Sequence, residues 1–295
     1  MPKKGTYKKN LEAITLDSEK FLGTAYDSMS PIGLVNIQAS PLRFYSGSGF
    51  FFKCPLWKDI FFVTAKHCVC DKDDNYRGEL LVHLDPQNRM PLTTFSHSFY
   101  GTLSGNKYPE DIIVYVVDGS VTEQMDILNY RSLFIPSKID EVHTILETLM
   151  GSNVKLRLVG SPHESREYVE KITIQSVDFP NREIEIPANT IEYRPRGLHG
   201  DLASVGNGVY LLENINRAED LNGYSGSPVV HLEPVKDTYC PVPVGVVVMG
   251  GNGMVRFLSM TVVTSLIEKY MADPQDPDLQ VRVFDKQVVP LYSCM

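Results

Sequence analysis

The chain has 295 residues, of which 43% are hydrophobic and 22% are charged. This length and composition suit one or two globular domains with a sizeable core. The formal net charge of -8 argues against a nucleic-acid partner, because contacts to phosphates need a basic surface.

The first part of the chain, residues 1–30, is predicted to be an extension ahead of the folded domains. Lysines at positions 3, 4, 8 and 9 indicate a solvated terminus, and an arm that binds a membrane or nucleic acid is the alternative. Apolar residues at Leu11, Ile14, Leu22 and Tyr26 favour a short helix. No stretch approaches the roughly 20 apolar residues of a membrane-spanning helix, and no apolar segment follows the lysines. We therefore expect a cytoplasmic protein with no membrane partner.

Residues 31–118 are predicted to form a first small β-barrel. Short apolar or alternating segments, separated by Gly, Pro and Asp, predict strands at residues 34–38, 42–45, 49–53, 60–64, 80–84 and 112–117. A linker then spans residues 119–153. Within it, the spacing of Ile139, Val142, Ile145 and Leu149 predicts a helix.

Residues 154–272 are predicted to form a second barrel and a C-terminal helix. The expected strands are residues 155–160, 169–177, 182–186, 209–212, 227–232, 242–249 and 257–263. The helix is expected from Val262 to Met271, ahead of a Pro-containing breaker. The tail, residues 273–295, ends in a strand-like segment that either packs back on the domain or serves for docking.

The most informative motif is the segment from Asn222 to Pro228, in which glycines stand two residues before Ser225 and directly after it. This pattern frees a backbone to expose a nucleophilic hydroxyl. His67 follows one apolar strand and Asp111 precedes another. The chain order is therefore His, Asp, Ser, which is one of three known triad orders.

These residue types suit acyl transfer. A serine hydroxyl needs a base within about 2.6–3.2 Å, and His67 is the candidate. Asp111 is expected to lie behind the ring, away from solvent, where it fixes the tautomer and stabilises the imidazolium. The backbone N–H groups of Gly223 and Ser225 are the candidate oxyanion hole.

Each motif also has an ordinary structural explanation. The glycines of the serine segment suit a simple turn, and His67 and Asp111 suit the ends of buried strands. Together, in this order and at strand edges, they favour catalysis. An α/β-hydrolase would need its histidine last, and His231, the one histidine after Ser225, is followed by an acid. A subtilisin plan needs an acid motif before the histidine, and the segment around Asp59 does not resemble one.

These segments together resemble the trypsin-like (chymotrypsin-fold) serine peptidases, on the side of the bacterial HtrA and glutamyl-endopeptidase branches. The matching pieces are Ser48-Gly49-Phe50, TAKHCV at 64–69, DIIV at 111–114, GYSGSP at 223–228 and the strand at 245–251. The resemblance implies an all-β, mainly antiparallel fold with two six-stranded barrels and short N-terminal, linker and C-terminal helices. Two residues depart from the family pattern: Lys66 stands in place of alanine, and Tyr224 in place of aspartate.

Tyr224 bears on activation. In trypsins the aspartate at this place pairs with a new N-terminal amine, which a phenol with a pKa of about 10 cannot do at neutral pH. Activation by N-terminal insertion is therefore not expected.

By resemblance, Cys54 and Cys68 stand like a pair that many trypsins bridge, but thiols are expected in a reducing cytosol. The grouping of His67, Cys68 and Cys70 lacks a complete four-ligand zinc spacing. We therefore expect neither a metal nor a cofactor.

The resemblance also places the specificity pocket between the segment before Ser225 and the strand that ends near Gly250. Val248 and Met249 on that strand disfavour acidic substrates, because glutamyl endopeptidases carry a histidine there. Glu219 suits a basic residue before the scissile bond, or is a solvated loop acid. A basic preference and a small or medium apolar preference both remain open.

The resulting hypothesis is a serine endopeptidase that cleaves peptide bonds in a protein or peptide substrate through an acyl-enzyme. The alternative from another class is an inactive trypsin-like binding module. A third is a latent protease that waits for a regulatory protein partner. The sequence leaves the oligomeric state open.

Overall fold

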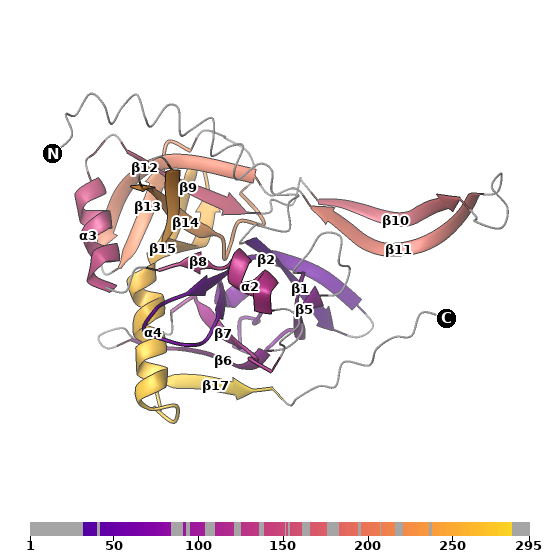
Figure 1. The fold of residues 1–295 in the computed structure, drawn as a ribbon, viewed down its shortest axis with the longest axis horizontal. Coiled ribbons are helices and arrows are strands. Elements are labelled where there is room, and N and C mark those ends of the chain that lie inside the picture. Colours follow the sequence, from indigo (N-terminus) through magenta and orange to yellow (C-terminus); the bar gives the residue numbers. More distant parts are fainter. Residues whose placement is uncertain are drawn as a thin grey trace.

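The computed structural model describes residues 32–39, 42–83, 91–92, 95–103, 110–120, 125–135, 139–150, 152, 154–160, 166–175, 183–193, 196–206, 208–215, 221–235 and 238–284. The expected N-terminal extension with its helix, and the end of the tail, lie outside these ranges. The described chain is mainly antiparallel β structure with few helices, as predicted. It contains one closed barrel and one open sheet (Figure 1).

The open sheet belongs mainly to the N-terminal half and has nine strands. They are β1 (Ile32–Ala39), β2 (Leu42–Lys53), β3 (Phe61–Thr64), β4 (Glu79–His83), β5 (Pro91–Leu92), β6 (Phe95–Gly101), β7 (Ile113–Val117), β8 (Leu133–Phe134) and β17 (Leu279–Val283). Their order is β17-β6-β7-β3-β2-β1-β4-β5, and β8 pairs in parallel with β2.

The predicted closure of this half into a six-stranded barrel is not found among the described strands. The free edge of β6 is taken by β17, which pairs with it from Leu279 opposite Gly101 to Val283 opposite His97. Because both edges of β6 are then paired, β6 is not available to close a barrel with β4 or β5. The tail segment 279–283 therefore packs back on the domain, while the rest of the strand-like segment, from residue 285 on, lies outside the described residues.

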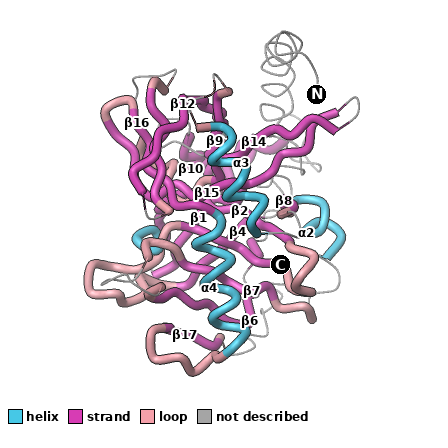
Figure 2. The backbone as a smooth tube through the Cα atoms, turned by 90° about the vertical axis from the view of Figure 1, so that its left-hand side faces the viewer, coloured by secondary structure: helices cyan, strands magenta, loops and turns pink. Residues whose placement is uncertain are grey.

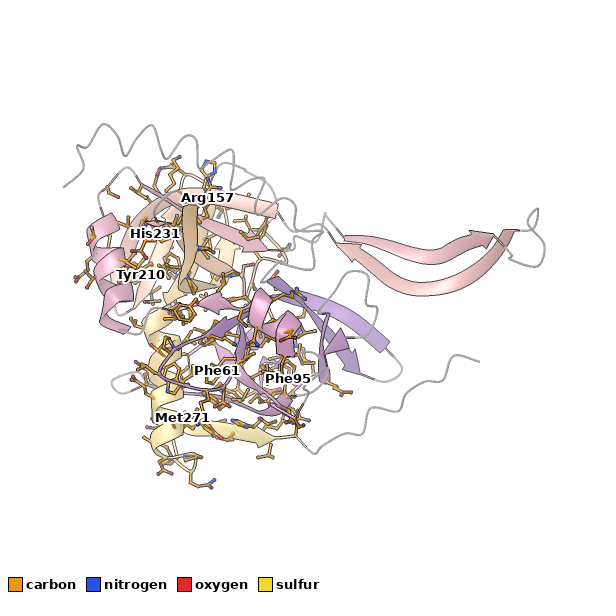
Figure 3. All side chains as sticks on the ribbon, viewed as in Figure 1. Phe61, Phe95, Arg157, Tyr210, His231 and Met271 are labelled. Atoms are coloured by element: carbon orange, nitrogen blue, oxygen red, sulfur yellow. The ribbon has the colours of Figure 1, made fainter. Side chains whose placement is uncertain are left out.

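Aromatic side chains fill both faces of this sheet. Strand alternation sends Phe51 and Phe62 to one face, where their rings lie 5.0 Å apart, and Phe52 and Phe61 to the other, where they stack at 5.3 Å. Figure 3 shows Phe61 among the packed side chains of this half. Burial on both faces explains why these strands appear in the sequence as continuous apolar runs.

The closed barrel belongs to the C-terminal half. Its strands, in barrel order, are β12 (Arg196–Gly206), β13 (Val209–Glu213), β16 (Met254–Ser259), β15 (Thr238–Gly251), β14 (Pro228–Val235) and β9 (Lys155–Gly160). A barrel was predicted here, but two of its strands were assigned wrongly. The segments predicted at 169–177 and 182–186 form β10 (Arg166–Gln175) and β11 (Glu183–Tyr193), which pair with each other and project from the body (Figure 1).

The described ranges contain few helices. They are η1 (Lys66–Cys68), α2 (Met125–Arg131), α3 (Ile139–Leu149) and α4 (Met260–Ala272). The helix predicted in the linker is confirmed as α3, and the predicted C-terminal helix is α4. The strand expected at 257–263 ends earlier, because Ser259 caps α4 by accepting a hydrogen bond from the amide of Thr261 at 3.2 Å.

Helix α4 runs beside both halves of the molecule (Figure 2). Near its end, the ring of Tyr270 stacks on Phe99 of β6 at 4.3 Å, and Lys269 donates to the carbonyl of Thr102 at 3.1 Å. The chain continues from these contacts into β17, so α4 connects the barrel to the sheet. None of the helices in the described ranges has the length and apolar character needed to cross a membrane.

His97 on β6 is held in a stack beneath α4. Its ring lies 4.9 Å from that of Tyr270, and its Nδ1 pairs with the hydroxyl of Ser96 at 2.8 Å. Its buried Nε2 has no hydrogen-bond partner among the described residues. Burial lowers the pKa of His97, and the charge of Asp59 opposes this only in part.

This lowered pKa predicts acid destabilisation. As pH falls below the unfolded value near 6.5, the unfolded chain binds a proton that folded His97 resists, so stability present above that pH is lost. Between about pH 7.5 and about pH 5.5, we expect the Tm of the wild type to fall relative to that of His97→Phe, which keeps the stack. Thermal melts of both proteins across this range check it. The comparison is made between the two proteins because the lowered pKa of His231 and the raised pKa of His67 act in both of them. An unchanged slope in His97→Phe would remove His97 as a cause.

Candidate active site

His67 and Asp111 meet because their strands are antiparallel neighbours. Strands β3 and β7 pair with Thr64 opposite Ile113, so the residues that follow β3 and those that precede β7 lie at the same end of the sheet. His67 stands in the short helix η1 just after β3. Asp111 stands two residues before β7. The sequence order of strand and polar residue therefore fixes this encounter.

The carboxylate of Asp111 binds His67 twice. One oxygen accepts from the backbone amide of His67 at 3.0 Å, and the other pairs with ring Nδ1 at 2.7 Å. The amide of Lys66 also donates to the Asp111 carbonyl, at 3.3 Å. Since a carboxylate only accepts, a proton is held on Nδ1, and when the ring is neutral its lone pair is on Nε2, on the far side from Asp111.

This pair changes the basicity of the ring. The hydrogen bond to Asp111, followed by the contact with the Cys68 sulfur, raises the pKa of His67 well above its usual value near 6.5. Both side chains remain partly exposed, at 47% for His67 and 38% for Asp111. The expectation that Asp111 lies away from solvent is therefore wrong. Asp111 lies in a bend ahead of β7, beyond the fully buried part of the strand.

Lys66, one of the departures from the family pattern, is engaged away from the histidine. Its ammonium lies 2.6 Å from Asp74 and 4.9 Å from the centre of the Tyr100 ring. These contacts hold the loop that follows η1. Lys66 therefore makes structural contacts beside the site that do not involve the His67 ring.

Ser225 lies in a tight double turn between β13 and β14. The amide of Tyr224 donates to Leu221 at 3.3 Å, that of Ser227 to Tyr224 at 2.9 Å, and that of Gly226 to Val247 of β15 at 2.7 Å. Gly223 and Gly226 both have positive φ, at 94° and 84°. A Cβ at Gly226 would overlap the Ser48 carbonyl, so only glycine fits there.

The turn is docked on the N-terminal sheet. The amide of Ser48 on β2 donates to the carbonyl of Ser225 at 2.8 Å, and the Cys68 sulfur lies 3.7 Å from the same oxygen. Ser225 therefore lies against the residue next to His67, although the two come from different halves of the chain. Among the described residues, no hydrogen bond joins the Ser225 hydroxyl to the His67 ring. Such contacts are often loose before substrate binds.

The amides expected to form an oxyanion hole differ from their neighbours. The amides of residues 224, 226 and 227 all donate within the protein. Those of Gly223 and Ser225 have no acceptor among the described residues. Two unengaged amides two residues apart, one of them on the serine, are the arrangement that binds a developing oxyanion.

The predicted specificity residues differ in their exposure to solvent. Val248 is buried, while Met249 is 60% exposed and Gly250 is exposed beside it on β15. Glu219 lies outside the described residues. Leu221 was missed by the sequence reasoning: a Cβ at Gly250 would lie 2.8 Å from the Cβ of Leu221. Its position two residues before Gly223 was the only signal for it in the sequence.

The cysteines near the site are thiols. Cys54, Cys68 and Cys70 are free and buried, so the pair suggested by resemblance is not bridged. Cys54 and Cys68 belong to the cores on different sides of the sheet, which keeps them apart. The residue that faces the Cys68 sulfur on β2 is Gly47. Within the described ranges, no group of three or more His, Cys, Asp or Glu side chains is placed to hold a metal ion.

Comparison with solved structures gives distant likenesses. No protein-family model and no curated protein matches the chain. Among solved structures, the chain is similar to the inactive form of a serine-to-alanine mutant of Rv3671c from M. tuberculosis H37Rv, with a TM-score of 0.40 and 14% identity. The match covers 85% of this chain and 91% of that one.

Proposed function

We propose that this protein is a serine endopeptidase of the chymotrypsin type, in which the open sheet and the barrel correspond to the two halves of that fold. The observation that supports it most is the docking of the Ser225 turn on the sheet that carries the His67–Asp111 pair, through the Ser48–Ser225 hydrogen bond. The branch of the family, HtrA-like or glutamyl-endopeptidase-like, stays a prediction.

The reaction follows from the protons. Ser225 Oγ attacks the carbonyl carbon of the peptide while its proton passes to Nε2 of His67. Asp111 accepts the hydrogen bond from Nδ1–H throughout and stabilises the imidazolium. The oxyanion is bound by the amides of Gly223 and Ser225. His67 then protonates the leaving amine, and a water activated by His67 releases the acid product from the acyl-enzyme.

The substrate is proposed to lie along the end of β15. The backbone at Met249 to Gly251 pairs with β16 on one edge, and an extended peptide would add to the other. Of the two preferences left open by the sequence, the close packing of Leu221 against Gly250 favours a small apolar residue, because it narrows the space between the two walls of the pocket.

The second candidate is an inactive binding module. The raised pKa of His67 favours it at neutral pH, since a protonated ring cannot accept the serine proton. The peptidase and the binding module predict different answers to one chemical test, because only an activated serine attacks phosphorus.

The test is labelling by a fluorophosphonate probe. We expect the wild type to be labelled, faster as pH rises, and Ser225→Ala to be unlabelled. The matched control is Ser227→Ala, two residues along the same turn, whose buried hydroxyl has no partner among the described residues and which should keep its labelling. A wild type that stays unlabelled at every pH, with intact far-UV circular dichroism, would favour the binding module.

A further inference from the structure

Ser48, on β2, makes two hydrogen bonds to the turn that carries Ser225. It is fully buried, and its hydroxyl donates to the carbonyl of Gly223 at 2.8 Å. Its amide donates to the carbonyl of Ser225, also at 2.8 Å. Its own carbonyl accepts from the hydroxyl of Thr64 on β3 at 2.7 Å. One residue of the N-terminal sheet therefore binds two peptide groups of a turn that belongs to the barrel half.

The turn needs hydrogen bonds from outside itself to fix its conformation. Gly223 and Gly226 have positive φ, and a glycine backbone has little intrinsic preference for one orientation over another. In trypsins an aspartate directly before the serine forms an ion pair that fixes this turn, and here Tyr224 stands in its place. Tyr224 is only 3% exposed, and a Cβ at Gly160 would lie 2.6 Å from its ring. The ring anchors the turn in the barrel core, but it leaves the peptide groups on either side of it to be oriented by other means.

The geometry points to Ser48 as a positioning residue for the oxyanion site, which rests on the proposed function. The carbonyls of Gly223 and Ser225 are both directed at Ser48, and the amides of the same two residues are the ones left without an acceptor among the described residues. The held carbonyls belong to the Gly223–Tyr224 and Ser225–Gly226 peptide groups, which flank the peptide group that carries the Ser225 amide. Holding both flanking groups restricts rotation of the group between them and keeps the Ser225 amide aimed at the oxyanion site, whereas the Gly223 amide lies one Cα before the first held group.

The hydroxyl of Ser48 is the group that a substitution can remove without removing the backbone contacts of Ser48. Its backbone contacts survive any substitution, whereas the bond to Gly223 is lost in Ser48→Ala. Loss of a donor from an oxyanion hole costs about 10²–10³ in kcat, and a donor left in place but free to rotate should cost less. The effect should fall on the reaction step, because the unreacted substrate makes weaker use of these amides.

The experiment measures the rate of fluorophosphonate labelling as a function of probe concentration. In Ser48→Ala we expect the maximal rate to fall by about 10- to 100-fold with half-saturation nearly unchanged. Ser48→Thr keeps a hydroxyl and should recover most of the rate. The matched control is Ser132→Ala, which removes a hydroxyl that donates to the carbonyl of Leu128 at 2.6 Å, far along the chain from the site. It should label like the wild type.

The outcomes separate this role from the proposed function. If the wild type is labelled and Ser48→Ala labels at the same rate, the positioning role is wrong and the peptidase stands. If Ser48→Ala raises half-saturation instead, Ser48 shapes the binding cleft and the role is also wrong. A wild type that is never labelled overturns the proposed function and this role with it. Equal Tm in Ser48→Ala and Ser132→Ala guards against misfolding as the cause.

Discussion

Replacing His67 or Ser225 by alanine is expected to reduce kcat by about 10⁶-fold, and the double variant should be scarcely worse than either one. The reason is that the two residues act in one proton transfer. Once His67 is gone, the Ser225 hydroxyl has no base, and once the hydroxyl is gone, the ring has nothing to deprotonate. The measurement is peptide hydrolysis by the two single variants and the double variant at one pH.

Non-additivity is the decisive part of this result. If the two losses multiply in the double variant, the residues act independently and do not form a catalytic unit. Full hydrolysis by Ser225→Ala would remove Ser225 as the nucleophile. The control is Ser227→Ala on the same turn, which is expected to keep the wild-type rate.

Asp111→Asn is expected to lower the maximal rate by about 10⁴-fold while leaving the fold intact. An amide can donate where the carboxylate only accepts, so it no longer holds the proton on Nδ1 of His67, and the imidazolium loses its counter-charge. The matched control is Asp74→Asn, an acid whose partner is Lys66 and not the histidine. A normal rate in Asp111→Asn would remove Asp111 from the catalytic machinery.

The same variant should move the pH profile in a defined direction. Asp111 raises the pKa of His67, and only the neutral ring acts as a base, so wild-type activity should rise with pH through that raised pKa. In Asp111→Asn the acid limb should shift to lower pH. The pair also contributes stability that is complete below the unfolded pKa and is lost as pH rises through the folded one. Asp111→Asn should therefore lower the Tm at neutral pH more than at alkaline pH.

The sequence predicted those features that depend on local order along the chain. Apolar runs bounded by Gly, Pro and Asp located β2, β3 and β7, and the 3.6-residue spacing located α3. Because β3 and β7 are neighbours, a histidine after one and an aspartate before the other were bound to meet. The sequence reasoning identified that pair and the serine turn, and their catalytic roles remain predictions.

The sequence indicated less clearly which strands pair with one another. The segment of β12 (RGLHGDLASVG) contains three glycines and little alternation, so it was overlooked as a strand. It nevertheless closes the barrel, because its register with β9 and β13 satisfies its backbone. The more strand-like segments β10 and β11 pair only with each other. Strand propensity indicates that a segment is extended, but not which edge it joins.

The sequence alone thus determined that the chain is mainly β, that it carries a histidine, an aspartate and a serine at strand ends, and that glycines flank the serine. Only the tertiary structure decided that β17 takes the edge of β6 and leaves the N-terminal sheet open, and that Ser48 holds the turn of Ser225. The first set follows from side-chain patterns within a few residues. The second depends on hydrogen bonds between segments far apart in the chain, such as Ser48 and Gly223, which are 175 residues apart, and their partners are chosen by the packing of the whole chain and not by any local signal.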